Sequence, residues 1–335
     1  MILTYKIKHG GDFSAELVKA RQVAEFVLEH GLCTTPAIKH FGLKSAIANQ
    51  IIQKYGRNKK IKKVSRVNLT IPGQGIKNDI EASVIYIPCL KLSMPYQFSG
   101  FLKINQIEIS KEYAFVSVTV SENEPIQPKS WIGIDLNTTG HCCVASNPAT
   151  GKVLKLGKKA YHIHRKYKSQ RRYFQKKQKY SLIKKTKDRE SRIVRDLNHK
   201  ISRKVVDYAL ENKAGIVMED LSGIRKTKKQ ARSFRYSLHS WSFYQLQQFI
   251  AYKAKLLGIP VVKIDPAYTS QQCSRCGLLG ERNGKHFECP ACGHVENADV
   301  NASFSISLRH QGILQLPTQR VVGKGSTDTP QEATA

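Results

Sequence analysis

The sequence predicts a multidomain α+β protein. A small β-barrel with a helical insertion comes first, and a layered α/β domain of mixed strand direction follows, with an inserted four-cysteine zinc ribbon. Short alternating strands fill residues 67–120, apolar strands alternate with helices after residue 131, and two Cys-x-x-Cys pairs interrupt this second pattern. At 335 residues the chain is long enough for two or three domains with separate cores.

The first 130 residues predict a strand, a group of helices and then a series of strands. Residues 2–8 alternate apolar and polar side chains, after which the apolar period becomes helical. Thr35 before Pro36 predicts the start of a second helix, and Gly42 separates it from a third helix around 45–55. Two helices with a turn between them and basic residues after them fit either nucleic-acid contact or plain three-helix packing. Strands expected at 67–71, 82–86, 101–104, 107–109 and 114–120 complete the barrel.

A mixed sheet is expected from residue 131 onward. Three strands, at 131–134, 142–146 and 153–156, should form an antiparallel meander, because a turn with Pro and Gly joins the last two. A buried apolar strand at 215–218, a helix and a further strand at 259–264 follow. Strands that pair first with each other and then alternate with helices indicate the RNase H arrangement.

The charge balance predicts a polyanionic partner. The chain has 55 Lys and Arg against 25 Asp and Glu, a formal net charge of +30 that exceeds what solubility requires. Residues 151–205 hold 21 Lys and Arg, three acidic residues and interspersed aromatic side chains, which suits phosphate pairing with base stacking. A solvated helix face would normally mix both charge signs. We expect His162 and His164 at the surface or against phosphate. The candidate nucleic-acid contacts are Arg57, Lys59, Lys60, Lys62, Lys63, Arg165, Lys166, Arg171, Arg172, Lys176 and Lys177.

Several classes of protein are excluded by what the sequence lacks. No apolar stretch of roughly 18 residues predicts a membrane span, and the opening MILTYKIKHGG has no apolar signal-peptide core, so we expect a cytoplasmic protein without membrane contact. The sequence has no Ser-His-Asp order, Gly-rich phosphate loop or dinucleotide fingerprint. Triad hydrolases and P-loop ATPases are therefore excluded.

Three acidic residues stand where a metal site would need them. Asp135 ends the strand expected at 131–134, and Glu219 ends the strand at 215–218. A carboxylate that closes a buried strand is costly unless it is paired or binds a metal. Asp299 precedes a short helix, where Asp is commonly a cap. If they converge, the three would form a cage of hard oxygen ligands for two Mg²⁺ ions, or Mn²⁺ in their place, suited to phosphodiester hydrolysis.

Two Cys-x-x-Cys pairs, Cys273 with Cys276 and Cys289 with Cys292, predict a zinc site. Twelve residues separate the pairs, and a glycine follows each pair, which lets backbone amides turn toward the thiolates. Four thiolates at this spacing are typical of structural Zn²⁺. Disulfides are the alternative, which an intracellular chain disfavours.

Four segments resemble the TnpB family, transposon-encoded proteins once called OrfB transposases and similar to the ancestors of type V CRISPR effector nucleases. These are Gly-Ile-Asp-Leu-Asn at 133–137, Val-Met-Glu-Asp-Leu at 217–221, Asp-Pro-Ala-Tyr-Thr-Ser-Gln at 265–271 and Asn-Ala-Asp-Val-Asn-Ala at 297–302. The resemblance is specific over 131–308 and architectural over the first 130 residues. Many members have glycine where this chain has Asn137, and the chain is short for the family, which implies a minimal recognition insertion.

The resemblance implies an RNA-guided DNA endonuclease. Guide RNA from the transposon end would select double-stranded target DNA next to a short adjacent motif, and Asp135, Glu219 and Asp299 would be catalytic. The implied domains are a wedge-type, oligonucleotide-binding-like β-barrel (1–11 and 56–124), a helical recognition insertion (12–55), a RuvC-like nuclease domain (125–268 and 294–310) and a target-binding zinc ribbon (269–293). A loose tail over 311–335 would remain, because it is rich in Gly, Thr, Gln and Pro.

Three other functions stay open. The first is a guide-RNA-directed DNA-binding regulator that has lost cutting, against which the complete acidic triad argues. A guide-independent nuclease such as a junction resolvase is the second, and the additional barrel and zinc ribbon argue against it. The third is a transposase that joins DNA ends in recombination, which would need oriented end recognition that the sequence does not show.

Overall fold

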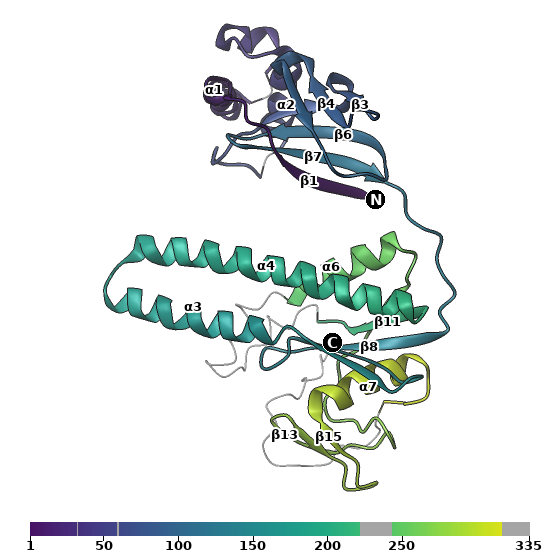
Figure 1. The fold of residues 1–335 in the computed structure, drawn as a ribbon. Coiled ribbons are helices and arrows are strands. Elements are labelled where there is room, and N and C mark those ends of the chain that lie inside the picture. The colour runs from purple at the N-terminus through teal and green to yellow at the C-terminus, as the bar shows by residue number, and fades with distance from the viewer. Residues whose placement is uncertain (32, 59, 222–242, 317–335) are drawn as a thin grey trace. The chain divides into compact units, whose positions relative to one another are not determined.

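A change of pattern near residue 121 separates two units, Met1–Ser121 and Glu122–Ala335, in the computed structural model (Figure 1). The structure describes residues 1–316 apart from 32, 59 and 222–242. The tail predicted at 311–335 therefore lies outside the described residues from 317 onward. The division at Ser121 falls near the predicted domain end at residue 124, and the assignment of segments to named domains stays a prediction.

Strands of the first unit form two antiparallel sheets. The four-stranded sheet has the order β1 (Ile2–Lys8), β7 (Tyr113–Val120), β6 (Phe101–Ile109), β2 (Leu69–Pro72). The three-stranded sheet has the order β3 (Lys77–Asp79), β4 (Val84–Ile87), β5 (Leu92–Pro95). In β7 every second side chain is buried, and Val116 and Val118 fully so, because successive residues of a strand point to opposite faces. The pairings of the described residues keep the two sheets separate, so a closed barrel stays a prediction.

A helical segment separates β1 from β2, as expected. It comprises α1 (Ser14–His30), the 3-10 helix η1 (Pro36–Phe41) and α2 (Ser45–Gly56). The expected helix cap at Thr35 is not formed, because the Thr35 hydroxyl donates to Asn49 Oδ1. The predicted strands at 101–104 and 107–109 are a single strand, β6, with irregular register at two points.

The second unit contains the predicted mixed sheet. Its order is β10 (Lys152–Leu156), β9 (Cys143–Asn147), β8 (Ser130–Leu136), β11 (Ala214–Glu219), β12 (Val261–Ile264). The first three strands form the antiparallel meander, and β8, β11 and β12 are parallel. The helices are α3 (Lys158–Lys176), α4 (Tyr180–Glu211), α6 (Phe243–Leu256) and α7 (Ala298–His310). In Figure 1, α4 and α6 cover one face of this sheet and α7 the other. None of the described helices is both long and apolar enough to cross a membrane.

Close packing of α7 on β8 fixes the position of the last helix. A Cβ atom at Gly133 would stand only 2.0 Å from the backbone oxygen of Ser303, so only glycine allows this approach. The α7 residues next to Gly133 are the small residues Ser303 and Ser307, and Ser307 Oγ donates to the backbone oxygen of Trp131 at 2.8 Å. Sequence and packing thus hold α7 directly against β8, the strand that contains Asp135 near its end.

A small three-stranded sheet precedes α7. It consists of β13 (Glu281–Asn283), β14 (His286–Glu288) and β15 (Val295–Asn297), which are antiparallel neighbours in this order. Its core contains Phe287, fully buried, beside Cys273 and Cys289. So few apolar side chains cannot stabilise a sheet of this size by themselves, which is why the four cysteines matter to its fold.

We expect Gly133→Ala to destabilise the second unit by about 3 kcal/mol or more, because overpacking against backbone atoms cannot be relieved by a rotamer change. Urea denaturation followed by circular dichroism measures the loss. Gly75→Ala in the first unit is the matched control, since its Cβ would meet one methyl group of Ile71 at 3.1 Å and no backbone atom. Equal midpoints for Gly133→Ala and the unaltered chain would show that α7 does not pack as described.

Candidate functional site

Asp135 is the last residue but one of β8, and Glu219 is the last residue of the neighbouring parallel strand β11. The register of β8 with β11 pairs Ile134 with Met218, and the next residues along both strands are the two carboxylates. Carboxyl ends of parallel strands share one edge of a sheet, where α/β proteins commonly bind ligands. The strand-end placement predicted from the sequence is therefore confirmed for both residues.

The surroundings of both carboxyl groups disfavour their charged forms. Burial, with a further contribution from the Asp299 charge, raises the pKa of Asp135 to about 6. Glu219 keeps some exposure as a residue, but its carboxyl is enclosed; burial, followed by the charge of Asp135, raises its pKa to about 8. Two carboxylates that repel each other out of water are stabilised by an added cation.

Asp299 lies in the first turn of α7 and is 3% exposed. The helix cap is Asn297, whose Oδ1 accepts from the backbone amides of Asp299 at 3.2 Å and Val300 at 3.4 Å. The Asp299 carboxylate is therefore free of the capping role that is common for Asp at this position. Because its charge acts on Asp135, the two carboxyl groups share one electrostatic environment.

Two cations from the small sheet reach Asp299, and the sequence analysis missed both. Lys285 Nζ lies 2.6 and 2.8 Å from the two carboxylate oxygens and 3.3 Å from Asn137 Oδ1. Arg282 donates to Asp299 Oδ1 at 3.4 Å. In the sequence both look like surface charges of a zinc ribbon, and only the fold of β13 and β14 turns them toward the carboxylate.

Neutral donors hold the other two carboxylates. Asn137 Nδ2 donates to Asp135 Oδ2 at 2.7 Å, and the Thr269 hydroxyl donates to Glu219 Oε1. Thr269 is 2% exposed, and its segment, 265–271, is one of the four that carried the family resemblance. That segment was the sequence signal for Thr269, whereas Asn137 was singled out only as a departure from the family.

The four cysteines form the tightest group of metal-ligand side chains. Their four sulfur atoms all lie within 4.8 Å of one another. Among the described residues, these cysteines are the group of three or more His, Cys, Asp or Glu that could hold a metal ion. The three carboxylates act on one another through their charges: that of Asp299 acts on Asp135, and that of Asp135 acts on Glu219. At the cysteines, a zinc ligand set is already assembled.

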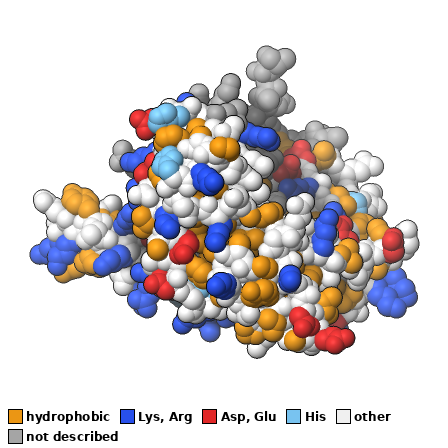
Figure 2. Space-filling view, turned by 90° about the horizontal axis from the view of Figure 1, so that it is seen from above, with side chains coloured by type: hydrophobic (Ala, Val, Ile, Leu, Met, Phe, Trp, Pro, Cys, Tyr) orange, Lys and Arg blue, Asp and Glu red, His pale blue; other side chains and the backbone are white. Residues whose placement is uncertain are grey.

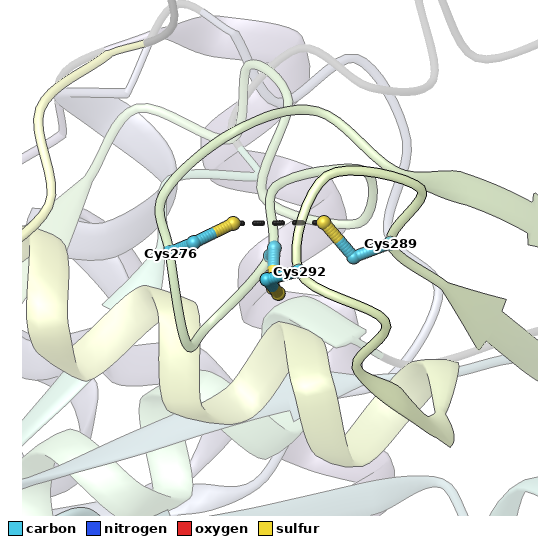
Figure 3. Close-up of side chains that lie close together, drawn as sticks. Cys276, Cys289 and Cys292 are labelled. Atoms are coloured by element: carbon cyan, nitrogen blue, oxygen red, sulfur yellow. Dashed lines mark hydrogen bonds between the residues drawn. The ribbon is translucent and has the colours of Figure 1, made fainter.

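Cys273, Cys276, Cys289 and Cys292 converge from two tight turns. Sγ of Cys273 lies 3.7 Å from that of Cys292, and Sγ of Cys276 lies 3.5 Å from that of Cys289. Four thiolates 2.3 Å from a central Zn²⁺ lie about 3.8 Å apart, so the spacing fits a tetrahedral ion. Figure 3 shows the sulfur atoms of Cys276 and Cys289 facing each other, together with Cys292. None of the four forms a disulfide bond, and together they could hold a zinc ion.

The candidate nucleic-acid contacts fall into two groups. Arg57, Lys60, Lys62 and Lys63 follow α2 in the first unit and are exposed, while Lys59 lies outside the described residues. Arg165, Lys166, Arg171, Arg172 and Lys176 lie on α3, and Lys177 directly follows it. Figure 2 shows Lys and Arg side chains spread among hydrophobic ones over the visible face.

Two residues of the basic stretch have internal partners. His164 is 9% exposed, so its expected surface position is wrong; its Nδ1 lies 2.7 Å from Glu190 Oε1. Arg171 donates to the other oxygen of Glu190, and its side chain is only 16% exposed. Burial alone would raise the pKa of Glu190, but hydrogen bonds from His164 and Arg171 outweigh it and hold that pKa below its usual value. The buried acid thus ties α3 to α4.

The chain is similar in sequence and in fold to known proteins. Residues 243–306 match the family described as Cas12f1-like, TNB domain. A solved structure described as a Cas12f1-sgRNA-target DNA complex has a similar fold, with a TM-score of 0.59 at 18% identity over 88% of this chain and 82% of that chain. That likeness concerns the fold, since the identity is low.

Three curated relatives are similar in sequence. "TnpB-like protein MJ0751" of Methanocaldococcus jannaschii is 32% identical over 230 residues, which is 64% of this chain and 81% of that protein. "Putative RNA-guided DNA endonuclease InsQ" of Escherichia coli is 27% identical over 77% of this chain and 70% of that protein. "CRISPR-associated endodeoxyribonuclease Cas12f1" of Sulfoacidibacillus thermotolerans is 46% identical over 115 residues, but this match covers only 26% of that longer protein. By these similarities and its TNB domain, the chain belongs to the TnpB family.

Proposed function

We propose that this protein is an RNA-guided DNA endonuclease that hydrolyses phosphodiester bonds with divalent cations held by Asp135, Glu219 and Asp299. The observation that carries the proposal is the enclosure of Asp135 and Glu219 at adjacent strand ends, with the pKa of each raised by burial and by a neighbouring carboxylate. Carboxylates enclosed in this way are costly without a cation. Enclosed carboxylates of this kind are typical of a metal-dependent active site.

The donor set fits Mg²⁺, or Mn²⁺ in its place, because it consists of carboxylate oxygens. Bound there, two such ions would activate the attacking water and stabilise the leaving oxygen. The protein's own residues orient the ligands: Asn137 holds Asp135, and the Thr269 hydroxyl holds Glu219. Lys285 and Arg282 keep positive charge beside Asp299, which lowers the repulsion that an approaching phosphate would meet.

Guide RNA and double-stranded target DNA are the proposed partners. Support comes from the net charge of +30 and from the relatives named as RNA-guided or CRISPR-associated endonucleases. In this proposal base pairing selects the target, the protein reads a short adjacent motif, and the guide RNA derives from the transposon end. The first unit would act as wedge and recognition module, and the zinc ribbon, 269–293, would bind target DNA beside the RuvC-like nuclease domain.

Asp135→Ala should abolish cutting while RNA binding persists, because the change removes a metal ligand without touching the basic helices. The chain is expressed with the nucleic acid that flanks its gene, co-purified RNA is sequenced, and plasmid cleavage with Mg²⁺ is measured. The control is Asp207→Asn, an exposed acid whose ion pair with Arg203 spans 3.8 Å and contributes little.

The alternative functions predict different results. RNA retention without cleavage in any version would replace the proposal by a binding regulator. Cleavage that persists without RNA would indicate a guide-independent nuclease. Joined DNA ends in place of linear product would indicate a transposase.

Metal binding should strengthen as pH rises. Asp135 and Glu219 must lose their protons to bind a cation, and their pKa values of about 6 and about 8 place that loss between roughly pH 5 and 9. The affinity of the metal-free protein for Mn²⁺ should therefore rise by at least about tenfold from pH 6 to pH 8, with proton release, as measured by calorimetry in buffers of different ionisation enthalpy.

The same pKa shifts determine the stability of the metal-free protein. Because the folded pKa values exceed the unfolded ones, the folded state holds more protons, and stability should fall as pH rises from about 4 to about 8. Glu219→Gln should reduce that fall. A pH-independent Mn²⁺ affinity, or an equally steep loss of stability in Glu219→Gln, would contradict these pKa values.

Cys276→Ser should release zinc and unfold the small sheet, since its core is too small to fold without the ion. Metal analysis by mass spectrometry and limited proteolysis between residues 273 and 297 measure the two effects. Cys33→Ser is the matched control, because Cys33 lies outside the cluster. Unchanged zinc content in Cys276→Ser would refute the site.

A further inference from the structure

A cleft between α3 and α4 lies apart from the acidic residues and from the cysteines. Its volume is about 270 Å³, and it is lined by Lys166, Tyr167, Gln170, Phe174, Leu182, Lys185, Thr186 and Arg189. The two helices run antiparallel as a hairpin (Figure 1). The lining positions have helical spacing, so each helix contributes one face to the cleft.

The floor of the cleft is aromatic and fixed. Tyr167 is 6% exposed and Thr186 is 9% exposed, and the Thr186 hydroxyl is satisfied by the backbone oxygen of Leu182 at 2.7 Å. One turn further along α4, Glu190 joins the helices through its contacts with His164 and Arg171. The cleft therefore has a rigid base rather than a loose surface depression.

The rim of the cleft is cationic and has no acid. Lys166, Lys185 and Arg189 are exposed, and α3 as a whole carries eight Lys or Arg and no Asp or Glu. Two acids adjoin the lining residue Arg189 in sequence: Glu190 is buried and already engaged, whereas Asp188 is exposed. Asp188 lines a second cavity, which shares Lys185 and Arg189 and adds Ser191 and Arg192. The net charge of that lining is still positive, so the positive rim continues along α4.

An aromatic floor under a rim of cations suits a ligand that is flat, partly apolar and anionic. A nucleotide has these properties, because its base stacks on aromatic rings while its phosphate pairs with Lys or Arg. A cavity of this size is small even for a small-molecule site, so it admits one base at a time. Bases inside a duplex are stacked and paired and cannot enter, which leaves an unpaired strand.

We propose that the cleft between α3 and α4 binds a nucleotide of a single-stranded polynucleotide, with the base against Phe174 and Tyr167 and the phosphate on Lys166, Lys185 and Arg189. The proposal rests on the proposed function only in that the partner is a nucleic acid. It assigns the helical hairpin a strand-holding role separate from cutting. Single-stranded RNA and displaced single-stranded DNA share this chemistry, and the experiment distinguishes them.

The test uses the full chain and three variants. Phe174→Leu keeps an apolar side chain but removes the ring, and Lys185→Gln removes one rim charge. Lys204→Gln is the matched control, an exposed lysine on the same helix that does not line the cleft. Fluorescence anisotropy gives the affinity for a 12-nucleotide uridine-rich RNA, the corresponding single-stranded DNA, and a hairpin duplex with the same number of phosphates.

Phe174→Leu should weaken single-strand binding by roughly five- to a hundredfold and leave duplex binding unchanged, because stacking is lost. Lys185→Gln should weaken it at least about threefold more than Lys204→Gln does, and should reduce the slope of log affinity against log salt by about 0.7. The strand type that shows the larger loss is the cleft's partner. Circular dichroism confirms that each variant is folded.

Single-strand affinity that is unchanged in Phe174→Leu, or an equal loss on the duplex, would overturn the proposal. If Phe174→Leu does not fold, Lys185→Gln against Lys204→Gln decides, and equal affinities of these two would overturn it. Failure of the endonuclease proposal is distinguishable: a chain that binds single strands through the cleft but never cleaves plasmid refutes cutting and leaves the cleft assignment standing.

Discussion

The approach of α7 to β8 is the constraint on which the candidate active site depends. Gly133 lets the backbone of the helix stand where any Cβ would collide with Ser303, and small serines line the helix face. Because Asp299 opens α7 and Asp135 follows Gly133 by two residues, this single contact sets how closely the two carboxylates approach. A larger residue at either surface would separate them. The geometry of the site is thus a consequence of backbone packing rather than of the acidic side chains.

The same helix also carries the small cysteine sheet. Asn301 donates to the backbone oxygen of Gln272 at 2.8 Å and accepts from the amide of Ser274 at 2.8 Å, so the first cysteine turn is attached two residues beyond Asp299. From there β13 and β14 return Lys285 to the Asp299 carboxylate. A zinc ion at the cysteines would therefore order the element that supplies positive charge to the acidic residues. Structural and catalytic metals would be coupled through α7.

The sequence allowed prediction of the mixed sheet, its strand ends and the cysteine cluster, because apolar period and ligand spacing are local signals. It did not allow prediction of β3 and β5, because these strands are too short to show an alternation of apolar and polar residues. Lys285 and Arg282 could not be predicted for another reason. The residues around a lysine or arginine in the sequence do not indicate which distant carboxylate it will contact. Here that contact depends on the pairing of β13 with β14. His164 was misplaced for the same reason, since its partner Glu190 is 26 residues away.

Glu190 compensates part of the charge on the α3–α4 hairpin through its buried contacts with Arg171 and His164. The exposed pairs on α4, such as Lys200 with Asp196 at 2.7 Å, contribute little in water. The remaining cations of α3 repel one another without an acid on that helix to offset them. Their repulsion lowers the stability of the hairpin in isolation, and a phosphate backbone would remove it by neutralising several cations at once. Binding a polyanion would therefore stabilise the hairpin, so the feature that weakens this part of the free protein is the one that strengthens its complex.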